Sequence, residues 1–136
     1  MRVLSSLLLG AALFGIGAAA TAAPSDTSKS EAKLAKALEG RVAGKPVSCI
    51  NLRDITSSEI FDGVAILYRV GGGRIYVNRP RIAPESLGSD DILVTKTYSS
   101  QLCSLDTVNL VDRGSRFQRG FVGLGDFVPY TKAPKN

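Results

Sequence analysis

The segment between the two cysteines constrains the fold of this chain more than any other feature. Cys49 and Cys103 are the only cysteines in the sequence, and they enclose its most strand-like stretch, Gly63 to Asn78. Three consecutive glycines divide that stretch into two apolar runs, and glycine accepts the positive φ that a tight loop requires. We therefore expect a β-hairpin in a small domain that one disulfide closes at its base.

The first residues have the pattern of a secretory signal peptide. Met1-Arg2 provides a positive start, an apolar run continues to Ile16, and small residues up to Ala23 suit cleavage. The run is short for a spanning helix and no basic cluster follows it, so a retained membrane anchor is the less favoured alternative. We expect residues 1–23 to be removed and the mature bacterial protein to be periplasmic or secreted, with no transmembrane segment left.

The rest of the sequence divides into a polar tract, one domain and a tail. Residues 24–30 lack apolar side chains and are predicted to be a disordered linker, and residues 132–136 form a predicted C-terminal tail. Between them, residues 31–131 are predicted to be a single domain that begins with a helix and continues as strands. This order predicts an α+β, mainly β fold, built on a small antiparallel sheet or an open barrel.

Local patterns predict the bounds of these elements. Ser30 is the expected N-cap of a helix over residues 31–39, and Gly40 is its expected left-handed end. The run from 64 to 70 is apolar on both faces, which predicts a central strand. The other strands are expected at 47–50, 54–60, 75–77, 92–97 and 105–111, with a closing segment at 121–130.

The residue types present argue against most catalytic chemistry. The chain has no histidine, so it lacks the commonest general base and transition-metal ligand, and we expect no catalytic residues, metal or cofactor. The alternative is a carboxylate-dependent hydrolase of the cell envelope, or an inhibitor of one, that uses Asp54 and Asp106. Both are expected at strand ends and bonded to nearby arginines. Asp62, Asp90 and Asp91 lie in turn-like segments that contain glycine or serine, where carboxylates usually cap backbone amides.

One loop combines cations with aromatic side chains. Arg113, Arg116 and Arg119 alternate with Phe117 and Phe121, a composition that can stack on single-stranded nucleic acid. Secretion argues against that partner. Two interpretations stay open: a solvated loop, which such sequences usually form, and a face that binds an anionic envelope glycan or lipid headgroup. The formal net charge of +5 is compatible with both.

Five short motifs are distributed along the predicted domain. They are Cys49 to Ile55, Asp62-Gly63, Tyr76 to Arg79, Gln101 to Asp106 and Gly123 to Tyr130. Together they resemble a family of small secreted proteins of unknown function from alphaproteobacteria and related bacteria. The resemblance implies an extracytoplasmic location and brings no activity. Some relatives carry two further cysteines that are both absent here, which implies that the two remaining cysteines pair with each other. We therefore expect a non-catalytic binding or envelope-associated module.

Overall fold

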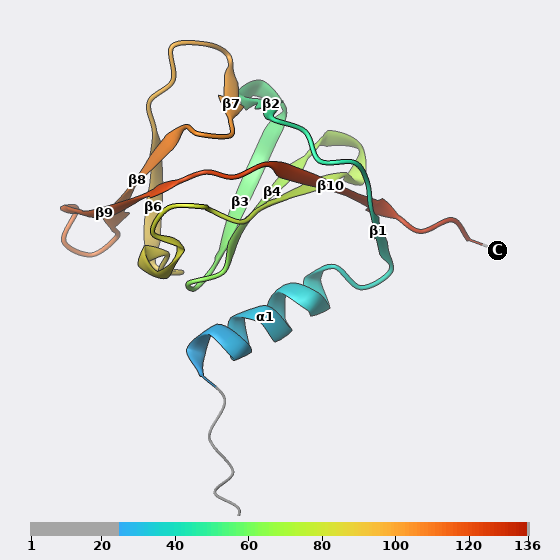
Figure 1. Cartoon of the computed structure of the whole chain (residues 1–136), viewed down its shortest axis with the longest axis horizontal. Coiled ribbons are helices and arrows are strands. Elements are labelled where there is room, and N and C mark those ends of the chain that lie inside the picture. Colours follow the sequence, from blue (N-terminus) through green and yellow to red (C-terminus); the bar gives the residue numbers. More distant parts are fainter. Residues whose placement is uncertain (1–24, 136) are drawn as a thin grey trace, which may run out of the picture.

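The computed structural model describes residues 25–135 and contains one α-helix followed by ten strands (Figure 1). The predicted signal peptide lies outside these residues. No helix within 25–135 is long and apolar enough to cross a membrane. The elements are α1 (Asp26–Ala37), β1 (Arg41–Ala43), β2 (Cys49–Asn51), β3 (Ile55–Phe61), β4 (Ala65–Val70), β5 (Ile75–Asn78), β6 (Asp91–Thr95), β7 (Gln101–Cys103), β8 (Thr107–Asp112), β9 (Gln118–Gly123) and β10 (Phe127–Lys132).

The strands form three antiparallel sheets, which confirms the predicted mainly β fold. One sheet has the order β1-β10-β5-β4-β3, a second has the order β6-β8-β9, and β2 pairs with β7. β9 continues into β10 as one long bent ribbon, red in Figure 1, so the first two sheets are joined at this bend. Seven of the described strands therefore follow one another as an open series, β3-β4-β5-β10-β9-β8-β6, in which β9 leads into β10 along the chain. β3 and β6 are the two ends of this series, and β1 and β9 are the other edge strands of the two sheets.

Two apolar clusters hold the domain together. The first, which we call the inner cluster, lies between the five-stranded and three-stranded sheets and includes Ile66, Tyr68, Leu102, Leu110 and Phe127. The second lies between α1 and the five-stranded sheet, and we call it the helix cluster. It consists of Leu34, Phe61, Val64, Ala65, Leu67, Ile75 and Val77. β4 contributes to both clusters, so the prediction of a central strand that is apolar on both faces is confirmed.

The helix begins earlier than predicted. α1 starts at Asp26, and the side chain of Ser25 caps it by accepting a hydrogen bond from the N–H of Ser28. Ser30, the expected N-cap, instead lies inside the helix and is buried against the sheet. The prediction that residues 24–30 form a disordered linker is therefore wrong from Asp26 onward. Polar residues that cannot fill a core still extend this helix, because a serine cap and an acidic first turn stabilise its N-terminus.

The structure confirms the predicted disulfide and glycine hairpin, and it contains two short strands that were not predicted. Cys49 and Cys103 are bonded and face each other in the β2–β7 register. Gly72 and Gly73 have φ of 75° and 74°, as the loop between β4 and β5 requires. The sequence did not predict β1 or β7. The run expected at 47–50 gives strand only from Cys49, because Val47 instead forms an isolated bridge to β10.

The end of β5 is fastened to the bend between β9 and β10. Asn78 is buried, its Nδ2 donates to the carbonyl of Gly125 over 2.6 Å, and its Oδ1 accepts from the N–H of Gly125 over 3.1 Å. A Cβ at Gly125 would lie 2.5 Å from the carbonyl oxygen of Arg79, so only glycine fits there. This contact fixes the bend that joins the two large sheets.

Candidate functional site

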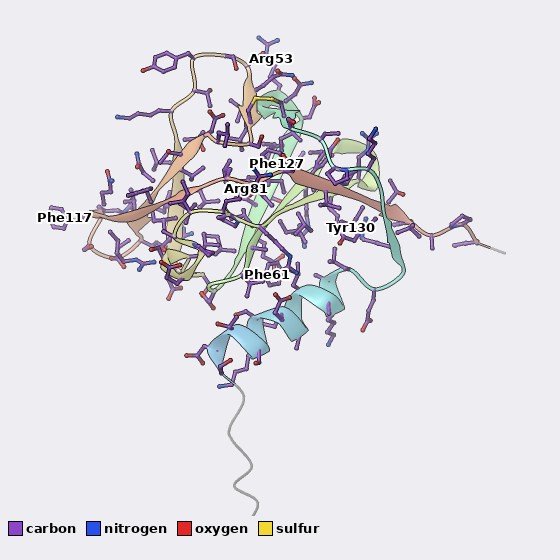
Figure 2. The ribbon with its side chains drawn as sticks, viewed as in Figure 1. Arg53, Phe61, Arg81, Phe117, Phe127 and Tyr130 are labelled. Carbon is purple, nitrogen blue, oxygen red and sulfur yellow. A yellow bond between two sulfur atoms is a disulfide. The ribbon has the colours of Figure 1, made fainter. Side chains whose placement is uncertain are left out.

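A cleft lies where the series of strands fails to close. One cavity of about 560 Å³ has β3 on one side and β6 on the other, with α1 at one end. A second cavity of about 210 Å³ shares Ser58 and Leu93 with the first and reaches Leu102 on β7. We call the two together the β3–β6 cleft. In Figure 2, Phe61 marks the end beside α1, and the yellow disulfide bond near Arg53 marks the opposite end of the domain.

Two strand edges and a half-buried apolar floor form this cleft. β3 is exposed from Thr56 to Glu59 although it pairs with β4, and a register shift lies between Ile55 and Ser57. A β-bulge of this kind twists a strand and changes the direction of its side chains. Ile60 and Leu93, both partly buried, line the cleft and pack against the inner cluster.

The carboxylates of the cleft all have partners. Glu59 pairs with Arg69 at 2.9 Å, and Asp62 accepts a hydrogen bond from the backbone N–H of Ser89. Asp91 is buried, accepts from the backbone N–H of Gly88 and forms an ion pair with Arg119. Glu59 and Asp91 are therefore each paired with an arginine, whereas Asp62 is held by a neutral backbone amide and keeps its negative charge.

Two cations of the cleft lack such partners. Lys33 on α1 and Arg113 in the loop after β8 line the larger cavity, and both are exposed. Within residues 25–135, neither side chain takes part in a hydrogen bond or ion pair. Among the described residues, two cations without ion-pair partners and one carboxylate without a cation, Asp62, therefore line this cavity, so positive charge is in excess there.

The structure separates the three predicted arginines. Arg119 donates from Nε to Asp91 over 3.0 Å and from Nη2 to the carbonyl of Ser86 over 2.7 Å. The hydrogen bond to Asp91 raises the pKa of Arg119. Because these bonds join β9 to β6 and to Ser86, Arg119 supports the fold. Arg113 lines the cleft, whereas Arg116 has a φ of 64° and lines none of the described cavities.

The structure also separates the two candidate catalytic carboxylates. Asp54 accepts from the side chain of Asn51 over 3.3 Å, and Asp106 accepts from the backbone N–H of Cys103 over 2.7 Å. The expectation that arginines hold them is therefore wrong. Asp54 lines a polar cavity of about 580 Å³ beside the disulfide, and Asp106 does not line it. Among residues 25–135, no three Asp, Glu or Cys side chains gather as a metal site would require.

Sequence reasoning missed Lys33 as a site residue and Asp91 as the partner of Arg119. Lys33 lies next to Leu34 on a helix whose apolar stripe is clear, but nothing local brings it near the loop after β8. Asp91 was predicted to cap a turn, and it does accept from Gly88. Its ion pair spans 28 positions and depends on the pairing of β6, β8 and β9.

The chain as a whole has no match among known proteins: no family model, curated protein or solved structure matches it, so the resemblance to small secreted alphaproteobacterial proteins stays a prediction.

Proposed function

We propose that this protein works in the periplasm or outside the cell as a non-catalytic binding module, and that its ligand presents an anionic group to the β3–β6 cleft. One observation carries the proposal: Lys33 and Arg113 line the cleft without partners among residues 25–135, whereas two of its three carboxylates, Glu59 and Asp91, are paired with arginines. The disulfide supports an oxidising compartment. A volume of about 560 Å³ is within the usual range for ligand sites.

The position of the two cations favours a bound anion over bulk counterions. A partly enclosed cavity has a lower effective dielectric than open solvent, so a charge pair inside it is stronger. Arginine can hold a carboxylate or phosphate through two parallel hydrogen bonds, and lysine adds a mobile point charge. Carboxylate, phosphate and sulfate groups share the chemistry that this end of the cleft recognises.

Two matched double variants test the anion site. Lys33→Gln/Arg113→Gln removes the two cleft cations, and Lys36→Gln/Arg116→Gln removes two exposed cations from the same helix and the same loop that line no described cavity. Heparin serves as a polyanionic probe, and the measurement is the salt concentration at which each protein elutes. The cleft variant should elute at clearly lower salt than the control variant. Equal shifts would show that only net charge matters and would contradict the proposal.

The compartment has its own test. Protein recovered from a periplasmic extract of the expressing bacterium should have the intact mass of a chain that lacks residues 1–23. A mass that retains these residues, or recovery only from the cytoplasm, would contradict the proposed location.

A further inference from the structure

The two strands that flank the cleft each end a sheet, so each presents a backbone edge without a partner strand. Consecutive residues of β3 and of β6 line the same cavity, which places both edges along one cleft. We infer that the ligand is an extended polypeptide segment that adds as a strand between β3 and β6, with a carboxylate held by Lys33 and Arg113. The position of the carboxylate rests on the anion site proposed above, and the strand pairing rests on the two edges.

A free strand edge carries a row of N–H and C=O groups, and it binds extended peptides through main-chain hydrogen bonds. Natural proteins protect such edges with lysine, other charged side chains, proline or β-bulges. The register shift of β3 lies at its Ile55 end, before Ser58 to Phe61, which line the larger cavity. Neither β3, with the sequence ITSSEIF, nor β6, with the sequence DILVT, contains lysine or proline. One added strand would join the ends of the open series of strands into a continuous ring.

The floor of the cleft matches the side-chain pattern of a strand. Alternate side chains of an extended peptide point to the same face, so every second residue would contact the floor. The floor is apolar along both cavities, with Ile60 and Leu93 in the larger and Leu52, Ile55 and Leu102 in the smaller. A peptide with alternating apolar residues would therefore cover it. A glycan or lipid headgroup would leave both the apolar floor and the backbone edges unused.

Charge sets the direction of the peptide. Lys33 and Arg113 line only the cavity beside α1, and the smaller cavity toward the disulfide has no charged lining residue. The carboxylate of the ligand, from its C-terminus or from an acidic side chain, should therefore lie at the α1 end. The inferred ligand of the cleft is therefore an extended segment of another protein that is apolar except for an acidic group.

A peptide library provides the probe. The secreted, disulfide-bonded protein is used to select from random linear peptides of about ten residues with free C-termini, a length that exceeds an ordinary strand. Selection should enrich peptides in which apolar residues alternate and an acidic group lies near one end. The best enriched peptide is then synthesised with a fluorescent label, and its dissociation constant is measured by anisotropy.

Ser57 and Ser58 supply a matched pair of variants, because both are exposed on β3 and only Ser58 lines the cleft. Ser58→Trp should fill the cleft and weaken peptide binding at least about tenfold, whereas Ser57→Trp should change it less than about twofold. Lys33→Gln/Arg113→Gln should also weaken it, and Lys36→Gln/Arg116→Gln should not. In the unmodified protein, bound peptide should slow amide hydrogen exchange in β3 and β6, a readout that needs no variant to fold.

The outcomes separate this inference from the anion site. If no peptide is enriched, or if bound peptide leaves exchange in β3 and β6 unchanged, the strand-addition inference is wrong, even where heparin retention still depends on Lys33 and Arg113. If sedimentation shows that the protein dimerises and Ser58→Trp prevents this, the occupant is a second copy and not a foreign peptide. If peptide binds through the strand edges but heparin retention does not depend on the two cations, only the proposed anion site is wrong.

Discussion

β4 and β3 are neighbours in one hairpin, but they differ in what covers them. From Ala65 to Tyr68, β4 is buried on both faces, between the inner cluster and α1. β3 forms a ladder along β4 and is nevertheless exposed from Thr56 to Glu59. The difference follows from position: β4 lies inside its sheet with an apolar cluster on each face, whereas β3 is the edge strand of the same sheet. The cleft lies where the second neighbour of β3 is missing.

Different forces hold the two sides of the molecule. The closed side, α1 with β4, β5 and β10, is stabilised by apolar burial in the helix cluster and the inner cluster. The open side, β3, β6 and the β2–β7 pair, shares the inner cluster through Ile50 and Leu102, and it is held in addition by the disulfide and the Arg119–Asp91 ion pair. A binding site needs a surface that apolar packing has not filled, and such bonds allow the open side to keep one.

Removal of the disulfide should have the largest effect on the open side. The bond joins residues separated by 54 positions, and closing a loop of that size should stabilise the native state by about 4 kcal/mol in the entropic model. The total stability of such a domain is about 5–15 kcal/mol. Urea unfolding of Cys49→Ser/Cys103→Ser should therefore give a much smaller free energy than the oxidised wild type. A loss below about 1 kcal/mol would show that the open side does not depend on the bond.

Two leucine-to-alanine variants provide a direct comparison of the stability of the two sides. Leu67 on β4 is 0% exposed, so Leu67→Ala should cost about 3 kcal/mol of unfolding free energy. Leu93 on β6 is only partly buried and lines the cleft, so Leu93→Ala should cost about half as much. Denaturant titrations of the two variants provide the measurement. Equal losses would contradict the distinction between a packed side and an open side.

Arg119 and Arg113 lie in one hairpin, but among the described residues only Arg119 has an ion-pair partner. Arg119→Gln leaves the carboxylate of Asp91, whose side chain is 2% exposed, without its cation, and it should cost about 2 kcal/mol. Arg113→Gln should change the melting temperature very little, because its exposed side chain has no partner within residues 25–135. The sequence alone predicts little cost for either change. Equal melting temperatures would show that the ion pair with Asp91 adds nothing to stability.

Acid should weaken the docking of α1 slightly. A hydrogen bond from Arg79 lowers the pKa of Glu31 below its ordinary value of 4.5. The unfolded chain binds this proton more readily, so the stabilisation is complete above that value and is lost as pH falls through the lower folded pKa. Both side chains are about half exposed, so the effect should stay below about 1 kcal/mol. Stability measured through this pH range should show a step that Glu31→Gln abolishes. An unchanged step would assign it to another carboxylate.

The sequence predicts the closed side better than the open side, for physical reasons. Residues 64–70 are apolar on both faces, and this pattern is local, so the central strand could be recognised. The glycine loop was predictable from three consecutive glycines, and the disulfide was predictable because the sequence has only two cysteines. The start of α1 could not be predicted from its apolar content, because Ser25 and Asp26 stabilise it by capping and charge.

The cleft could not be predicted because no short stretch encodes it. β6 pairs with β8 and not with β3, and this choice decides that two edges stay free. Lys33 and Arg113 line one cavity only because tertiary packing brings α1 and the loop after β8 to the same end of the cleft. The role of Arg119 depends in the same way on a carboxylate that is distant in sequence. Each of these is a consequence of tertiary pairing.

Amide hydrogen exchange of the free protein, followed residue by residue by NMR, tests the central claim that β3 and β6 are both open to the cleft. In an antiparallel edge strand, alternate N–H groups point toward the partner strand and away from it. Exchange along β3 and β6 should therefore alternate, with the cleft-facing amides about a hundredfold faster than those of β4. Uniform protection along β3 and β6, equal to that of β4, would mean that the free protein already covers both edges, and it would contradict the account.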